Sequence, residues 1–126
     1  MAVKYTVVPK KDPFKPESPP KYYPTAVSTN HTGLRALAER IALMSTYSIG
    51  DTIGMLELLL QVLPDELARG NIVELGELGA FYLTIRASGE DDPEKVGRDN
   101  IKEAKVHFKP GKSFRNALND VEFHKA

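Results

Sequence analysis

Residues 70–88, "GNIVELGELGAFYLTIRAS", contain two alternating runs of apolar and polar residues on either side of a glycine pair. Apolar residues alternate with polar ones on both sides of a pair of glycines, at Val73 and Leu75 and again at Phe81, Leu83 and Ile85. Such alternation predicts two strands that each bury one face. Gly76 and Gly79 between them supply the backbone freedom that a tight turn needs. The stretch therefore predicts an antiparallel hairpin with one apolar face.

Two helices are predicted before this hairpin. Apolar residues recur at three- and four-residue steps over residues 33–45, where Thr32 is placed to cap the first helix. Ser48 and Asp51 form a pair resembling a capping box before the second helix, which ends at Gly70. The second helix is apolar around much of its circumference, more than a chain of 126 residues can cover. We therefore expect a partner subunit.

After the hairpin, a charged stretch leads to residues 102–108, "KEAKVHF", which alternate again as a returning strand. Residues 113–123, "SFRNALNDVEF", have one apolar face and predict a short helix. The predicted order is two helices, a three-stranded antiparallel meander with a long second connection, and a short terminal helix.

The first 30 residues form a Pro-rich N-terminal extension. Six of the nine prolines lie within the first 24 residues. Residues 3–8 and 22–28 are rich in β-branched and aromatic side chains, so we expect two short strands joined by a Pro-rich loop. We divide the chain into this extension, residues 1–30, and a second domain, residues 31–126.

Composition excludes several classes of function. The chain has no cysteine, which excludes disulfides and thiolate metal sites. It has no run long enough for a membrane span and no signal peptide at its start, so a cytoplasmic protein without a membrane partner is expected. Its histidines, at positions 31, 107 and 124, lie in separate elements without metal-ligand spacing. We predict no catalytic residues, no metal, no cofactor, no small-molecule substrate and no enzymatic activity.

Two motifs carry a resemblance to a known family. The first is Gly-x-(Leu/Phe)-Gly-x-Phe, present as Gly76, Leu78, Gly79 and Phe81, and the second is Phe-(Lys/Arg)-x-Gly-Lys, present as Phe108, Lys109, Gly111 and Lys112. With the matching order of elements over residues 32–122, they make the chain resemble the HU and IHF family of bacterial histone-like DNA-binding proteins. The N-terminal extension is similar to that of a longer-chain HU-like subgroup.

The resemblance implies a fold and a function. The implied fold class is α+β: an HU/IHF-like intertwined homodimer with two N-terminal helices, a three-stranded antiparallel sheet and a short C-terminal helix. A β-arm, at about residues 86–105, would protrude from the sheet. The implied function is binding of double-stranded DNA in the nucleoid with low sequence specificity, and bending of the DNA.

The resemblance also implies which residues contact DNA. Basic side chains on the sheet and at the roots of the arm would neutralise phosphates: Arg86, Lys102, Lys105, Lys109, Lys112 and Arg115. Pro93 is the candidate for the wedge that family members insert between base pairs. It follows Asp91 and Asp92, which phosphates would repel.

Two interpretations of the acidic stretch, and two functions, remain open. Residues 90–94 lack the alternating ligands of an Asp-rich calcium loop, which leaves a solvated loop tip or a tip that redirects DNA binding. The chain carries 17 basic and 17 acidic residues, so its net charge is zero. A neutral chain is unusual for a DNA-binding protein. The alternative function is therefore a dimeric scaffold of the same fold that engages proteins and binds little or no DNA.

Overall fold

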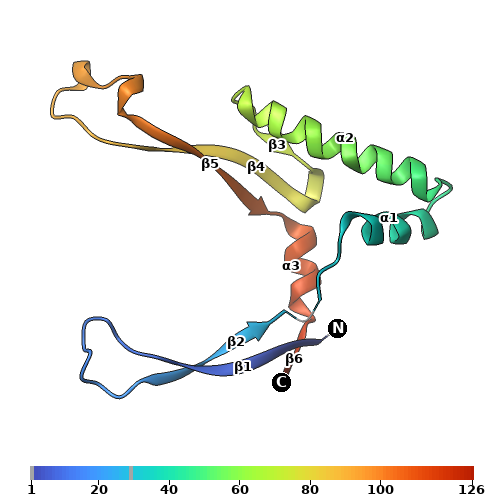
Figure 1. Ribbon diagram of the computed structural model, residues 1–126, viewed down its shortest axis with the longest axis horizontal. Coiled ribbons are helices and arrows are strands. Elements are labelled where there is room, and N and C mark those ends of the chain that lie inside the picture. The colour runs from blue at the N-terminus through green and yellow to red at the C-terminus, as the bar shows by residue number, and fades with distance from the viewer. Residues whose placement is uncertain (1, 29) are drawn as a thin grey trace. The chain divides into compact units, whose positions relative to one another are not determined.

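The computed structural model describes residues 2–28 and 30–126. The chain divides into two compact units, one formed by Met1–Gly33 with Ala117–Ala126 and the other by Leu34–Asn116. Figure 1 labels the helices and strands of both units. Within the described residues, none of the helices is both long enough and apolar enough to cross a bilayer.

The unit Leu34–Asn116 begins with the two predicted helices, α1 (Leu34–Leu43) and α2 (Ile49–Ala68). Ser48 caps α2, because its Oγ accepts a hydrogen bond of 3.0 Å from the backbone N–H of Asp51. The cap holds the first turn in place and confirms the expectation drawn from this pair of residues.

Three antiparallel strands follow in the order β3 (Val73–Glu74), β4 (Gly79–Ala87) and β5 (Ile101–Pro110). The predicted hairpin is confirmed, since Val73 lies opposite Phe81 across the glycine turn. Phe81 in turn lies opposite Phe108, and their ring centroids are 4.6 Å apart. Phe114 of α3 (Lys112–Asn119) meets Phe108 edge to face at 5.7 Å.

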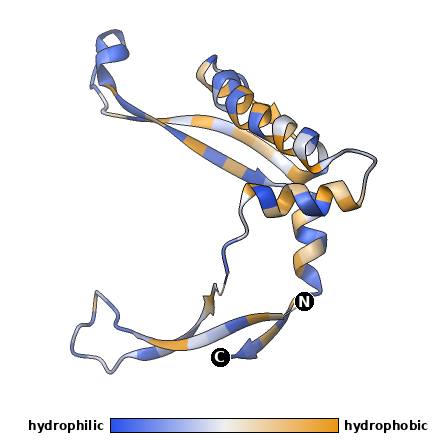
Figure 2. Ribbon diagram, turned by 45° about the vertical axis from the view of Figure 1, so that its right-hand side comes forward, coloured by the Kyte–Doolittle hydropathy of each residue, from blue (hydrophilic) through white to orange (hydrophobic). Residues whose placement is uncertain are grey.

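The core of this unit lies between the apolar face of the sheet and α2. Leu63 and Leu67 of α2 line the same hollow as Phe81, Leu83 and Val106 of the sheet. Figure 2 shows the hydrophobic positions along α2 and β4. Ala38 and Leu67 are the only buried hydrophobic residues among those described, so a single chain has a small core.

The other unit is a second sheet, with strand order β2-β1-β6. Strands β1 (Ala2–Lys10) and β2 (Lys21–Val27) pair antiparallel, which confirms the two strands predicted in the extension. Strand β6 (Glu122–Lys125) pairs parallel to β1, with Val3 opposite Phe123.

The predicted fold class is wrong. The architecture is α+β with three α-helices and two three-stranded sheets over the described chain, and two strands precede the first helix where the HU/IHF-like fold class has two N-terminal helices. The predicted terminal helix also extends too far, because α3 ends at Asn119 and residues 122–125 form β6. The physical reason is the open edge of β1, which satisfies the backbone of the last residues by strand pairing.

Candidate nucleic-acid interface

The two glycine motifs of the sequence form one structural unit. The backbone N–H of Gly111 donates to the carbonyl of Leu78 at 2.9 Å, and Leu75 N–H donates to the carbonyl of Gly79 at 2.9 Å. A Cβ atom on Gly111 would clash with the backbone oxygen of Glu77. Glycine is therefore required where the turn before β4 meets the end of β5.

This unit positions basic residues from β5 and α3. Lys109 and Arg115 line a shallow depression beside the turn, together with Glu74. Lys112, the first residue of α3, is exposed. The helix starts here because the N–H of Arg115 donates to the carbonyl of Gly111 at 3.4 Å. The structure thus brings Lys109 and Arg115 to one depression, with Lys112 on the same short segment.

A second group of predicted residues lies on the polar face of β4 and β5. Arg86 lies opposite Glu103, and its Nε is 3.1 Å from the Glu103 carboxylate. The Nζ of Lys105 is 3.8 Å from the same oxygen. Glu103 therefore offsets part of the charge of both cations. Sequence reasoning missed this carboxylate, because its position opposite Arg86 depends on the register of β4 with β5.

The stacked pair Tyr82 and His107 lies between Lys105 and Lys109 on this face, with ring centroids 5.5 Å apart. Sequence reasoning considered His107 as a metal ligand and did not identify this aromatic pair.

Lys102 does not align with the other predicted cations. Arg86 pairs with Glu103 but the next residue, Ala87, pairs with Ile101, so Lys102 is an extra residue on β5. This is the pattern of a β-bulge, which leaves one residue unpaired and re-aims its side chain. The Lys102 side chain is exposed.

The tip between β4 and β5 is organised by Asn100, which is only 7% exposed. Its side-chain Oδ1 accepts from the N–H of Gly97 at 2.9 Å, and its Nδ2 donates to Glu90 Oε1 at 3.1 Å and to Ser88 Oγ at 3.3 Å. Pro93 begins a short 3₁₀ turn, Pro93–Lys95, and is exposed. The tip is therefore an ordered loop in which Glu90 has a structural partner.

The acidic residues of the tip do not assemble a metal site. Over residues 2–28 and 30–126, the structure contains no group of three His, Cys, Asp or Glu side chains placed to hold a metal ion.

Comparison with known proteins assigns the chain to a family. Residues 1–125 match the family described as "HU-HIG: HU domain fused to wHTH, Ig, or Glycine-rich motif". No curated protein sequence matches the chain. A solved structure from Bacteroides vulgatus, described as a "Putative bacterial DNA binding protein", has a TM-score of 0.68 and 15% sequence identity to it. The likeness covers 98% of this chain and 47% of that one, and at this identity it shows a shared fold.

The chain thus spans about half the length of that solved protein (47%). The resemblance to HU-like proteins, drawn from two motifs, is confirmed by the family match. Because this match extends over residues 1–125, the protein belongs to the HU-HIG family, whose HU domains are fused to wHTH, Ig or glycine-rich motifs.

Proposed function

We propose that this protein is a homodimer that binds double-stranded DNA with little sequence preference. The observation that carries the proposal is the cluster of Lys109, Lys112 and Arg115 around the glycine turn. Salt bridges within the described residues involve none of these three side chains, so their charges are available to neutralise phosphates. Membership of an HU family and the description of the solved relative support the same ligand.

The other predicted DNA-binding residues, Lys102, Arg86 and Lys105, differ in how much free positive charge they offer to phosphates. Lys102 also takes no part in a salt bridge among the described residues, and the bulge leaves it without a paired residue on β4. Arg86 and Lys105 share the carboxylate of Glu103, so the three groups together present one net positive charge. We therefore rank the cluster at the glycine turn first, Lys102 next, and the Arg86 and Lys105 pair last.

The tip of the β4–β5 arm is proposed to stay off the DNA. Pro93 is exposed, but Asp91, Asp92 and Glu94 beside it are exposed carboxylates. Bringing these charges to a phosphate backbone would be repulsive at contact distance and screened only beyond about 8 Å at physiological salt. Any bending of DNA would then come from contacts at the roots of the arm, without a wedge by Pro93.

The homodimer is supported by an apolar stripe on α2. Met55, Leu58, Leu59 and Val62 recur at helical spacing and are between 40% and 59% exposed. They do not line the hollow that Leu67 shares with the chain's own sheet. Covering the exposed half of such side chains contributes about 1 kcal/mol each. A second copy would supply the core that a single chain lacks, and would double the number of phosphate contacts.

Titration of a labelled 30-base-pair duplex, followed by fluorescence anisotropy at 50 to 200 mM salt, tests the DNA ligand. The logarithm of affinity should fall linearly with the logarithm of salt, with a slope of about −0.9 for each phosphate neutralised. Lys109→Ala with Arg115→Ala should reduce the magnitude of this slope by about 3.6, because each of the two protomers loses two phosphate contacts. Arg35→Ala with Arg69→Ala is the matched control, because it removes the same charge from an exposed position on α1 and from the exposed residue that follows α2.

The outcomes separate the two functions. Equal losses in the two double variants would reject the assigned site, because the effect would then follow net charge alone. Absence of binding by the wild-type protein at 50 mM salt would reject the DNA function. If that protein still sedimented as a dimer, the scaffold function would be favoured instead.

A further inference from the structure

The β1–β2 hairpin ends in a free two-stranded ribbon. Strand β1 pairs with β6 only as far as Tyr5, and from Thr6 to Lys10 it pairs with β2 alone. These five residue pairs give a ribbon about 17 Å long before the loop begins. A two-stranded β-ribbon has the width that the major groove of B-DNA admits.

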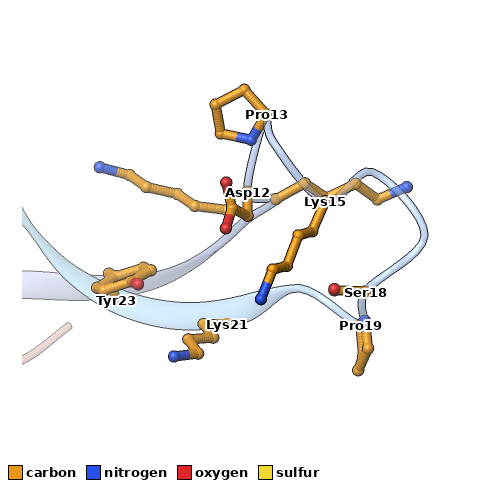
Figure 3. Close-up of a pocket in the computed structure, with 9 residues that line it drawn as sticks. Asp12, Pro13, Lys15, Ser18, Pro19, Lys21 and Tyr23 are labelled. Atoms are coloured by element: carbon orange, nitrogen blue, oxygen red, sulfur yellow. The ribbon is translucent and has the colours of Figure 1, made fainter.

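The end of this ribbon is basic. Four lysines line a hollow at the base of the loop: Lys10, Lys11, Lys15 and Lys21. Figure 3 shows Lys15 extending from the loop toward β2, where Lys21 and Tyr23 lie. Salt bridges among the described residues involve none of the four lysines, and Lys10 Nζ lies 5.7 Å from the centre of the Tyr23 ring.

The one carboxylate that lines the hollow has a structural role. Asp12 Oδ1 accepts from the N–H of Phe14 at 2.9 Å, and its backbone carbonyl accepts from the N–H of Lys15 at 3.1 Å. Ser18 N–H then donates to the carbonyl of Lys15 at 3.0 Å, which forms a second turn. Asp12 therefore holds the loop in shape, and the lysines around it keep their charge toward solvent.

The loop presents an aromatic side chain on a stiff backbone. Phe14 is 92% exposed, more than any other large hydrophobic residue described in the chain. Four of the ten residues between the strands are prolines, at positions 13, 16, 19 and 20, which fix φ and reduce the freedom lost on binding. An apolar side chain held in this way can enter a base step and partly unstack it.

We propose that the tip of the β1–β2 hairpin, residues 10–21, is a second DNA-contacting arm. Its lysines neutralise phosphates and Phe14 contacts the bases or sugars in a groove. The contrast with the β4–β5 tip favours this assignment, because residues 88–100 carry five carboxylates against Lys95 and Arg98, whereas residues 10–21 carry four lysines against Asp12 and Glu17. The inference takes its ligand from the proposed function but concerns the other unit of the chain.

The test compares two double variants of the full chain on the same duplex and over the same salt range. Lys15→Ala with Lys21→Ala should reduce the magnitude of the salt slope by up to about 3.6, as expected when each protomer of the dimer loses two phosphate contacts. Lys4→Ala with Lys125→Ala removes equal charge from the inner end of the same sheet and should leave the slope unchanged. Phe14→Ser should weaken binding on the order of tenfold without changing the slope, because stacking carries no counterion release.

Each outcome is decisive. An unchanged slope for Lys15→Ala with Lys21→Ala, while the wild-type protein binds the duplex, would overturn this inference and leave the proposed function standing. Equal losses in both double variants would also overturn it. Failure of the wild-type protein to bind would overturn the proposed function first. Binding of the same variants to phosphatidylserine vesicles is measured in parallel. If Lys15→Ala with Lys21→Ala kept its duplex affinity but lost binding to the vesicles, the loop would bind a membrane surface and the DNA arm would be rejected.

Discussion

Gly79→Ala should unfold the protein at markedly lower denaturant concentration. Gly79 has a φ of +144°, a region that essentially only glycine occupies, and placing another residue there costs about 1–3 kcal/mol. An added Cβ would also clash with the carbonyl of Lys109 and lie 2.8 Å from the ring of Phe108. Overpacking of this kind costs a further 1–3 kcal/mol or so. The loss is therefore about 2–6 kcal/mol, a large part of the 5–15 kcal/mol that typically stabilises a domain.

Urea denaturation followed by far-ultraviolet circular dichroism measures this effect at a fixed protein concentration. With a slope of about 2 kcal/mol per molar urea, the midpoint should fall by roughly 1–3 M. Gly89→Ala is the matched control, because nothing lies within 4 Å of its added Cβ and its φ is not in the positive range. Equal urea midpoints for Gly79→Ala and Gly89→Ala, within experimental error, would contradict the close packing of the two motifs at Gly79.

Three further predictions follow from the site and from α2. Glu103→Gln should tighten duplex binding and steepen its salt dependence, measured by anisotropy, because it releases two cations; unchanged binding would show that the strand face does not contact DNA. Asn100→Ala should speed amide hydrogen exchange over residues 88–100, since each lost buried hydrogen bond costs about 1–3 kcal/mol; slow exchange there would contradict its organising role. Leu58→Lys with Val62→Lys should halve the sedimenting mass to 14.0 kDa, and a dimer that persists would place the interface elsewhere.

Local patterns in the sequence predicted the parts of the fold that depend on local interactions. Both helices and the Ser48 cap follow from side chains three or four residues apart. The glycine hairpin follows from alternation on either side of Gly76 and Gly79. The motif that contains Lys109 lies beside the glycine turn, where Gly111 N–H donates to the carbonyl of Leu78, and phosphate binding by its basic residues stays a prediction.

The parts that failed depend on pairing between distant residues. Strand β6 was read as the end of a helix because the edge that it pairs with lies at the other end of the chain. The bulge at Lys102 breaks the simple alternation of β5, which a period of two cannot reveal. The pairing of Glu103 with Arg86 and Lys105 depends on the same register, so the charges of these two candidates could not be weighed from sequence.

The parallel pairing of β1 with β6 constrains how the chain folds. It joins Ala2–Tyr5 to Glu122–Lys125, so the whole of Leu34–Asn116 lies in the loop that this contact closes. Closing such a long loop is slow, whereas the contacts within Leu34–Asn116 span shorter separations and can form earlier. During synthesis, β1 and β2 leave the ribosome long before β6. One edge of β1 therefore stays unpaired until the residues of β6 have emerged. A truncation that removes only residues 122–126 would leave that edge of β1 unpaired permanently. The truncated protein should then self-associate through this edge.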